Sequence, residues 1–198
     1  KRASNLDEAQ EHKLRLICHK LMLRPGHRLL DIGSGWGGLL RYAAECFGAT
    51  GVGLTVSSEQ AAYANETMSD LPGIDCRLED YRAHRGRYDR VVSVGMFEHV
   101  GPKNYRTFFR KCRQLLRADD GLLVLQTIGA NRTRASGDPW ISKYIFPNSK
   151  LPSAEQLARG ADDLFLIEDW QNLGPDYDRT LMAWQERFAA AWPRLKAR

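Results

Sequence analysis

Two patterns of apolar and polar positions alternate along the chain. Short runs dense in aliphatic and β-branched residues predict buried strands, and longer stretches with apolar residues three or four apart predict helices. Strands are expected at 28–32, 50–54, 74–78, 88–94, 122–128 and 164–169. Helices are expected from about 5 to 21 and at 39–47, 58–68, 105–117, 153–159 and 177–192. Residues 130–152, which include three prolines, are expected to be irregular.

This alternation of strands and helices predicts an α/β fold with a doubly wound, mostly parallel sheet. A ligand of such a sheet is expected outside the carboxyl ends of the strands. Four segments that follow predicted strands carry glycines or polar residues there, namely 31–38, 55–60, 79–81 and 95–101. Because the carboxyl ends of parallel strands meet at one edge, these four segments predict a single binding site.

The segment after the first predicted strand, residues 33–38, reads Gly-Ser-Gly-Trp-Gly-Gly. Glycines let the backbone turn sharply and bring a ligand against bare peptide. The helix that follows offers unpaired N–H groups and a partial positive charge. Gly33, Gly35 and Gly38 also satisfy the dinucleotide pattern G-x-G-x-x-G, which suits NAD as well.

Two acidic positions distinguish these ligands. Asp31, just before the glycines, favours a ligand with a cationic amino-acid group, which S-adenosylmethionine (SAM) carries and NAD lacks. The second predicted strand has no acid at its end, where NAD sites often have one for the ribose. SAM is therefore favoured, and a nicotinamide enzyme is the weaker alternative.

Composition narrows the class of protein. The chain has 198 residues, of which 43% are hydrophobic and 27% charged, and this predicts one globular domain. No apolar run approaches the ~20 residues needed to span a bilayer. The four cysteines are widely spaced and form no C-x-x-C pair or cluster with histidine, so no metal site is predicted and buried, reduced thiols are expected.

The net charge of +5 arises from two local basic groups. One comprises Arg82, Arg85, Arg87 and Arg90, and the other comprises Lys103, Arg106, Arg110, Lys111, Arg113 and Arg117. Such groups form either an ordinary solvated surface or a surface that attracts anionic lipid or nucleic acid. Aromatic residues do not interleave with them as base stacking requires, so lipid is favoured and no nucleic-acid partner is predicted.

Several long segments closely resemble cyclopropane-fatty-acid synthases and the related mycolic acid cyclopropane synthases. They are 91–102 (VVSVGMFEHVGP), 138–141 (DPWI), 143–147 (KYIFP), 168–170 (EDW) and 180–184 (TLMAW). The resemblance covers nearly the whole chain. It implies a Rossmann-like SAM-dependent methyltransferase fold, with residues 1–198 as a single methyltransferase domain that is a fragment of a longer enzyme, apparently truncated at both ends.

The resemblance also implies an activity. Such enzymes transfer a methylene unit from SAM to the cis double bond of an unsaturated phospholipid acyl chain and form a cyclopropane. The protein would be cytoplasmic and contact the inner face of the membrane peripherally. The family members bind SAM through residues that correspond here to Gly33, Gly35 and Gly37 for the methionine part, Thr55 and Gln60 for the ribose, and Asp80 with Glu79 for the adenine amino group.

The chemistry requires a base and a dry site. Methyl transfer to an alkene leaves a carbocation, so a proton must leave for the ring to close, and water would trap the cation. In the family, a bicarbonate held by a glutamate, a histidine, a cysteine and a tyrosine is expected to act as the base. Glu98 matches the glutamate, and Gln126 stands where the histidine is expected. Glutamine can hydrogen-bond an anion but cannot take up a proton, which leaves bicarbonate binding open.

Two other functions remain open for this site. The chain could be a SAM-dependent C-methyltransferase whose lipid product is not cyclised, or a SAM-binding remnant without turnover. The family cysteine would precede Lys1 and the family tyrosine would follow Arg198. The expected sheet also ends on an unpaired apolar edge, which a partner, an additional segment or a second copy in a homo-oligomer would cover.

Exposed or buried positions are also predicted for the aromatic residues. One apolar cluster is expected to form either local core or the wall of an acyl-chain tunnel, and it comprises Trp140, Ile141, Tyr144, Ile145 and Phe146. The spacing of the later aromatics predicts ordinary core for Trp170, Trp184, Phe188 and Trp192.

Overall fold

The computed structural model describes residues 3–133 and 138–196. They form two compact units. The larger is Leu14–Leu166, and the smaller combines the segment that ends at Lys13 with the segment that begins at Ile167.

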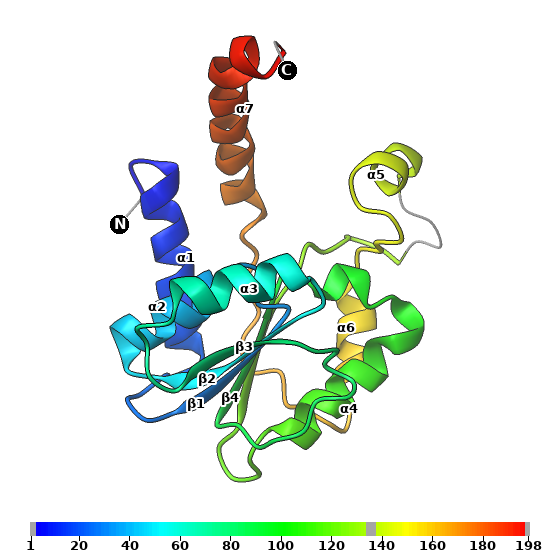
Figure 1. Ribbon diagram of the computed structural model, residues 1–198. Helices are drawn as coiled ribbons and strands as arrows, with labels where there is room; N and C mark the ends of the chain where they lie inside the picture. Colours follow the sequence, from blue (N-terminus) through cyan, green and yellow to red (C-terminus); the bar gives the residue numbers. More distant parts are fainter. Residues whose placement is uncertain (1–2, 134–137, 197–198) are drawn as a thin grey trace. The chain divides into compact units, whose positions relative to one another are not determined.

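The larger unit contains a five-stranded parallel sheet in the order β3-β2-β1-β4-β5 (Figure 1). Its strands are β1 (Arg28–Ile32), β2 (Thr50–Thr55), β3 (Ile74–Leu78), β4 (Arg90–Val94) and β5 (Leu122–Gln126). The order reverses between β1 and β4, where open α/β sheets bind their ligands. The predicted fold class is therefore confirmed, and β5 lies at an edge of the sheet although its apolar composition favours a central strand.

Helices cover both faces of this sheet and bury its apolar side chains. The end of α1 (Leu6–Lys20), α2 (Gly38–Phe47) and α3 (Ser58–Thr67) pack on one face. The other face is covered by α4 (Tyr105–Leu115) and α6 (Ala154–Ala161), with the short 3-10 helix Phe97–His99. A second short 3-10 helix, Pro102–Asn104, precedes α4 and has no buried residue. Residues alternate between the two faces along a strand, so Leu30 belongs to one core and Leu29 to the other.

The smaller unit contains α7 (Gly174–Lys196), which is longer than the predicted helix at both ends. Arg187 on α7 forms an ion pair with Asp7, at 3.2 Å between Nη2 and Oδ1. Among the described residues, no helix is long and apolar enough to cross a membrane.

The strand predicted at 164–169 was wrong. The chain leaves α6 through a turn in which the N–H groups of Leu164 and Phe165 both donate to the carbonyl of Ala161, at 3.0 Å each. These two side chains pack on the core, while Leu166 is 85% exposed. The apolar run therefore buries side chains without pairing its backbone in the sheet.

A helix also forms where irregular structure was expected. α5 (Pro139–Tyr144) begins at Asp138, whose side chain accepts from the N–H groups of Trp140 and Ile141 at 2.9 Å each. Proline at the first helical position favours a helix start, because that residue needs no N–H partner. The prediction took this proline as a helix breaker.

Two predictions of burial were also wrong. The side chains expected to form core after β5 are roughly half exposed: Trp170 57%, Trp184 49%, Phe188 57% and Trp192 48%. Trp140 and Tyr144 are exposed as well, which excludes the local-core alternative for them. Of the four free cysteines, three are buried as expected and Cys46 is exposed.

Candidate functional site

The loop after β1 leaves bare backbone at the carboxyl edge of the sheet. Gly33, Gly35 and Gly37 have φ angles of +84°, +55° and +83°, which glycine adopts without steric cost. A Cβ on Gly33 would lie 2.7 Å from Met96, and one on Gly37 would lie 2.8 Å from Met68, so these two positions pack tightly against side chains. A Cβ on Gly35 would have no atom within 4 Å, so this peptide faces open space.

Two hydrogen bonds hold this loop against the next strand. The backbone N–H groups of Gly33 and Ser34 both donate to the carbonyl of Leu54 in β2, at 2.9 Å each. The N–H of Gly37, at the start of α2, donates to the carbonyl of Ser34 at 3.0 Å. The shape of the loop is therefore set by the protein itself.

Asp31 lies in the middle of the sheet, opposite Gly53 of β2 and Val92 of β4. It is 2% exposed, and this burial raises the pKa of its carboxyl group from 3.8 to about 7. Its Oδ1 atom is buried and has no hydrogen-bond partner in the described part of the chain. A buried carboxylate in that state gains from a cationic ligand group, because the charge of the ligand offsets the cost of burial.

Glu98 is the second buried carboxylate of the candidate site, 5% exposed in the short helix after β4. Its Oε1 accepts from the N–H of Ile128 at 2.7 Å, which ties the segment after β4 to the segment after β5. Its Oε2 is buried without a partner. Over residues 3–133 and 138–196, the only buried side-chain nitrogen or oxygen atoms without a partner are this atom and Oδ1 of Asp31.

Gln126 ends β5, opposite Val94 at the end of β4. Its backbone carbonyl accepts from the N–H of Gly95 at 3.0 Å. Two residues after Gln126, the N–H of Ile128 donates a hydrogen bond to Glu98. The segments that carry the two predicted catalytic residues therefore lie together at one edge of the sheet. No side-chain hydrogen bond links Gln126 to Glu98 in the part of the chain described.

Thr55 and Gln60, predicted together for one part of a ligand, contact each other. The Thr55 hydroxyl donates to Oε1 of Gln60 at 2.6 Å. Ser57 begins α3 between them, and its side chain accepts from the N–H of Gln60 at 3.3 Å. The cap therefore holds Gln60 beside the end of β2.

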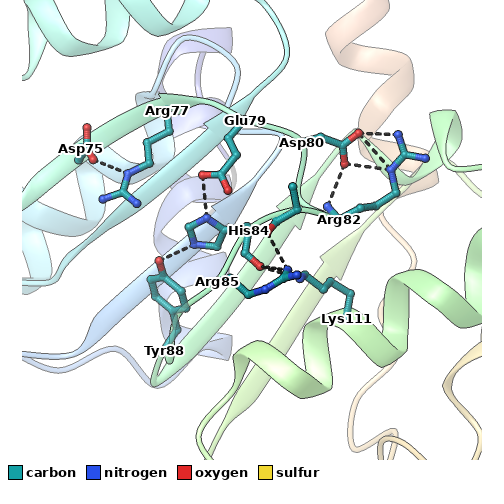
Figure 2. Close-up of polar contacts among 10 residues, drawn as sticks. Asp75, Arg77, Glu79, Asp80, Arg82, His84, Arg85, Tyr88 and Lys111 are labelled. Carbon is teal, nitrogen blue, oxygen red and sulfur yellow. Dashed lines mark hydrogen bonds and ion pairs between the residues drawn. The ribbon is translucent and has the colours of Figure 1, made fainter.

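The two acids after β3 already have partners (Figure 2). Oε2 of Glu79 lies 2.9 Å from Nδ1 of His84, and Nε2 of that histidine lies 2.7 Å from the hydroxyl of Tyr88. The Asp80 carboxylate accepts from the backbone N–H and the guanidinium of Arg82, and this bonding lowers its pKa.

Sequence reasoning missed His84, which is 1% exposed and orients Glu79. No motif marks this histidine, and its only sequence signal is its position a few residues after a predicted strand. Met96 was also missed. Its side chain lies against Gly33, and it precedes Glu98 by two residues, so the glycine loop and the segment after β4 meet there.

The arrangement provides an open peptide, two buried carboxylate oxygens without partners and several paired polar groups along one edge of a parallel sheet. Such a site suits a cationic, nucleoside-like ligand and holds a carboxylate for the stabilisation of positive charge. The described residues contain no group of three or more His, Cys, Asp or Glu side chains placed to hold a metal ion.

Comparison with known proteins identifies a family. The family model described as mycolic acid cyclopropane synthetase matches residues 1–198. The cyclopropane-fatty-acyl-phospholipid synthase of Escherichia coli (strain K12) is 52% identical over 195 residues, which are 98% of this chain and 50% of that protein. A probable fatty acid methyltransferase of Pseudomonas putida is 35% identical, over 92% of this chain and 49% of that protein.

A solved structure extends the similarity to three dimensions. The mycolic acid cyclopropane synthase CmaA1, complexed with SAH and CTAB, matches with a TM-score of 0.87 and 32% sequence identity. The match covers 98% of this chain and 73% of that one. The chain spans about half the length of the two relatives matched by sequence.

Proposed function

This chain belongs to the mycolic acid cyclopropane synthetase family, and we propose that it transfers a methylene unit from SAM to a lipid double bond. The substrate would be the cis double bond of an unsaturated phospholipid acyl chain, and the product a cyclopropane. Peripheral contact with a phospholipid bilayer on its cytoplasmic side is part of this proposal, because such acyl chains lie in the bilayer.

One observation carries the proposal. The two predicted carboxylates, Asp31 and Glu98, hold the only buried side-chain oxygens without a partner among the described residues. An unpaired buried polar atom costs free energy, so a protein retains it where a ligand supplies the missing partner. Two cationic groups of the proposed reaction, the ammonium of SAM and the carbocation of the lipid, suit a carboxylate.

SAM would lie along the carboxyl edge of the sheet. Its amino-acid part would cross the open peptide at Gly35, with its ammonium toward Asp31. Farther along that edge, Thr55 with Gln60 would take the ribose, and Asp80 with Glu79 would take the adenine amino group. The relative complexed with SAH supports this assignment, since it shares the fold at a TM-score of 0.87.

SAM supplies an electrophilic methyl group on sulfur. The alkene attacks that carbon as the sulfur–carbon bond breaks, and loss of a proton from the transferred methyl group lets the ring close. Glu98, whose free Oε2 is buried, would face the developing positive charge and hold the base in place. Ile128 keeps the carboxylate oriented through its N–H at 2.7 Å.

Bicarbonate as the base is a finer part of the proposal. A carboxylate with one free oxygen can accept the hydrogen of a bicarbonate, and the amide of Gln126 can donate to its oxygens. Neither residue is required to change its protonation state in that arrangement. Added bicarbonate is therefore expected to raise turnover, and bicarbonate-depleted buffer to lower it.

The test combines the chain, SAM and vesicles of monounsaturated phospholipid, followed by proton NMR of the extracted lipid. Signals of a cyclopropane ring support the proposal, and a methyl-branched alkene supports the C-methyltransferase alternative, which the Pseudomonas putida relative favours. The two products can have equal mass, which is why NMR is needed. Calorimetric binding of SAM without any product would identify a binding remnant.

Two variants assign the roles. Glu98→Gln keeps the acceptor for Ile128 but removes the charge, so we expect turnover to fall by about 100- to 10,000-fold with unchanged SAM affinity. Gln126→His introduces the residue expected by resemblance and should raise turnover if proton uptake at this position limits the rate. A Glu98→Gln variant with full turnover would contradict the proposed role of that carboxylate.

A further inference from the structure

The two basic groups seen in the sequence meet in one pocket of about 470 Å³. It lies between the β3–β4 connection and α4, away from the loop after β1. The residues that line it are Arg82, His84, Arg85, Gly86, Arg87, Thr107, Arg110, Lys111, Gln114 and Leu115. Four arginines and a lysine thus line the pocket, and among the described residues no aspartate or glutamate lines it.

Backbone carbonyls, and not carboxylates, hold three of these cations in place. Nη1 of Arg87 donates to the carbonyls of Gln114 and Leu116 at 2.8 and 3.1 Å. Nη1 of Arg85 and Nζ of Lys111 both donate to the carbonyl of His84, at 3.0 and 2.6 Å (Figure 2). A carbonyl orients a cation without neutralising it, and each cation keeps further N–H groups for a ligand.

Three of the residues that line the pocket, His84, Lys111 and Leu115, are buried. Lys111 is 9% exposed, and burial, followed by the positive charge of Arg85, lowers its pKa. The His84 carbonyl that these two cations share is itself fixed, because the imidazole is held between Glu79 and Tyr88. The positive charge of this part of the pocket is therefore crowded and held rigidly before any ligand arrives.

The exposed part of the pocket offers unused donors. Arg110 on α4 is exposed, and its guanidinium has neither a hydrogen-bond nor an ion-pair partner among the residues described. Arg82 is paired with Asp80, at 2.5 Å between Nη2 and Oδ2, and so contributes less net charge. An anion that entered between Arg85 and Arg110 would relieve the repulsion and gain charge-assisted hydrogen bonds.

We propose that this pocket binds the phosphate group of an anionic phospholipid headgroup at the bilayer surface. Arginine matches phosphate because its planar donors can bond two oxygens at once. The inference rests on the proposed function, which brings the chain to phospholipid. Among the described residues that line the pocket there is no phenylalanine, tyrosine or tryptophan to serve as a stacking platform for bases, so a nucleic acid is the less suitable partner.

The pocket would anchor the protein beside its substrate without taking part in the reaction. Its cations come from α4 and from the connection that also carries Glu79 and Asp80. A headgroup bound there would pull the β3–β4 connection and α4 together. We therefore expect the pocket to affect binding to vesicles and the apparent KM for lipid, and to leave kcat unchanged.

The test measures cosedimentation of the chain with phosphatidylglycerol vesicles and with phosphatidylcholine vesicles, in the absence of SAM. Arg110→Gln and the double variant Arg85→Gln/Arg110→Gln remove cations from the pocket. Arg113→Gln is the matched control, because it lies on the same helix, is exposed and does not line the pocket. Circular dichroism verifies that each variant folds.

We expect the double variant to weaken binding to phosphatidylglycerol vesicles about tenfold, Arg110→Gln about fivefold, and Arg113→Gln less than twofold. Glycerol 1-phosphate serves as a soluble analogue of the headgroup. It should displace the wild-type chain from the vesicles and have no such effect on the double variant. Competition by inorganic phosphate at equal strength would instead identify a site for free phosphate and overturn the headgroup assignment.

Other outcomes overturn the proposal as well. Equal losses in Arg110→Gln and Arg113→Gln would show diffuse attraction by total charge. A loss of binding to a DNA duplex, with vesicle binding intact, would assign the pocket to nucleic acid. If cyclopropane forms while the pocket variants bind vesicles normally, the pocket proposal alone fails. If the variants lose vesicle binding but no SAM-dependent product forms, the proposed function alone fails.

Discussion

The carboxylates near the ends of β1 and β3 differ in whether they have hydrogen-bond partners. Asp31, before the first loop, is buried with one oxygen that has no partner, and the peptide at Gly35 faces open space. After β3, Glu79 is bonded to His84 and Asp80 to Arg82. Asp31 lies within β1, which has β2 and β4 on either side, whereas Glu79 and Asp80 follow the edge strand β3. The two sites therefore differ both in their contacts and in their place in the sheet.

The difference indicates two kinds of binding surface. The first loop has an unsatisfied charge whose cost a ligand relieves, so binding there gains free energy from the protein itself. The second loop is already satisfied and can add only a modest contact to an adenine. We therefore expect substitutions at the first loop to change both stability and affinity, and those at the second loop to change little.

The largest effect is expected from Asp31→Asn on the stability of the ligand-free chain. Burial raises the pKa of this carboxyl from 3.8 to about 7. The folded state therefore holds a proton that the unfolded state has lost, and stability falls as pH rises from about 4 to about 7. At about 1.4 kcal/mol per unit, the asparagine variant should gain up to about 4 kcal/mol at pH 8.

Urea unfolding at pH 4 and pH 8 measures this effect. The gain should be nearly absent at pH 4, where the carboxyl is protonated in the folded state. An equal gain at both pH values would mean that it has another cause than ionisation.

The same variant should bind SAM about 100-fold more weakly, because it loses a charge-assisted contact in a buried site. Titration calorimetry with SAM measures the change. If Asp31→Asn gains stability and keeps its affinity for SAM, the unpaired oxygen of Asp31 has no part in binding. The proposed difference between the two loops would then be wrong.

Substitutions at Gly33 and Gly35 test the packing of the first loop separately from the access of a ligand to it. Gly33→Ala meets Met96 at 2.7 Å and a φ of +84°, so it should cost about 3 kcal/mol of unfolding free energy. Gly35→Ala meets only the cost of its φ of +55°, about 1–2 kcal/mol. We expect the second variant to remain folded and still bind SAM about tenfold more weakly, because its methyl group enters the open space. Thermal unfolding and calorimetry on both variants test this.

The smallest effect is expected after β3. Glu79→Gln keeps an acceptor for His84 and should lower SAM affinity less than about threefold. Calorimetry under the conditions used for Asp31→Asn allows a direct comparison. A loss as large as that of Asp31→Asn would show that the pairing with His84 breaks when the ligand binds.

Local patterns in the sequence were enough to predict most of the fold. The period-two and period-3.6 patterns placed the five strands and the helices that cover them within a few residues. The glycines after the first strand predicted the edge of the sheet at which a ligand would bind. The strand expected at 164–169 failed because apolar residues there bury side chains without a neighbouring backbone to pair with. The helix that begins at Pro139 also has a local cause, because proline suits the first helical position and Asp138 caps the helix.

The sequence by itself determined the order of elements, the glycine loop and the two carboxylates of the candidate site, because each depends on residues close together in the chain. Only the tertiary structure decided which polar atoms are satisfied. Asp31 and Glu98 each have an oxygen atom without a hydrogen-bond partner, whereas Glu79 is bonded to His84. The two basic groups meet in one pocket. Those outcomes depend on contacts between distant segments, which set burial and pairing and which a local pattern does not contain.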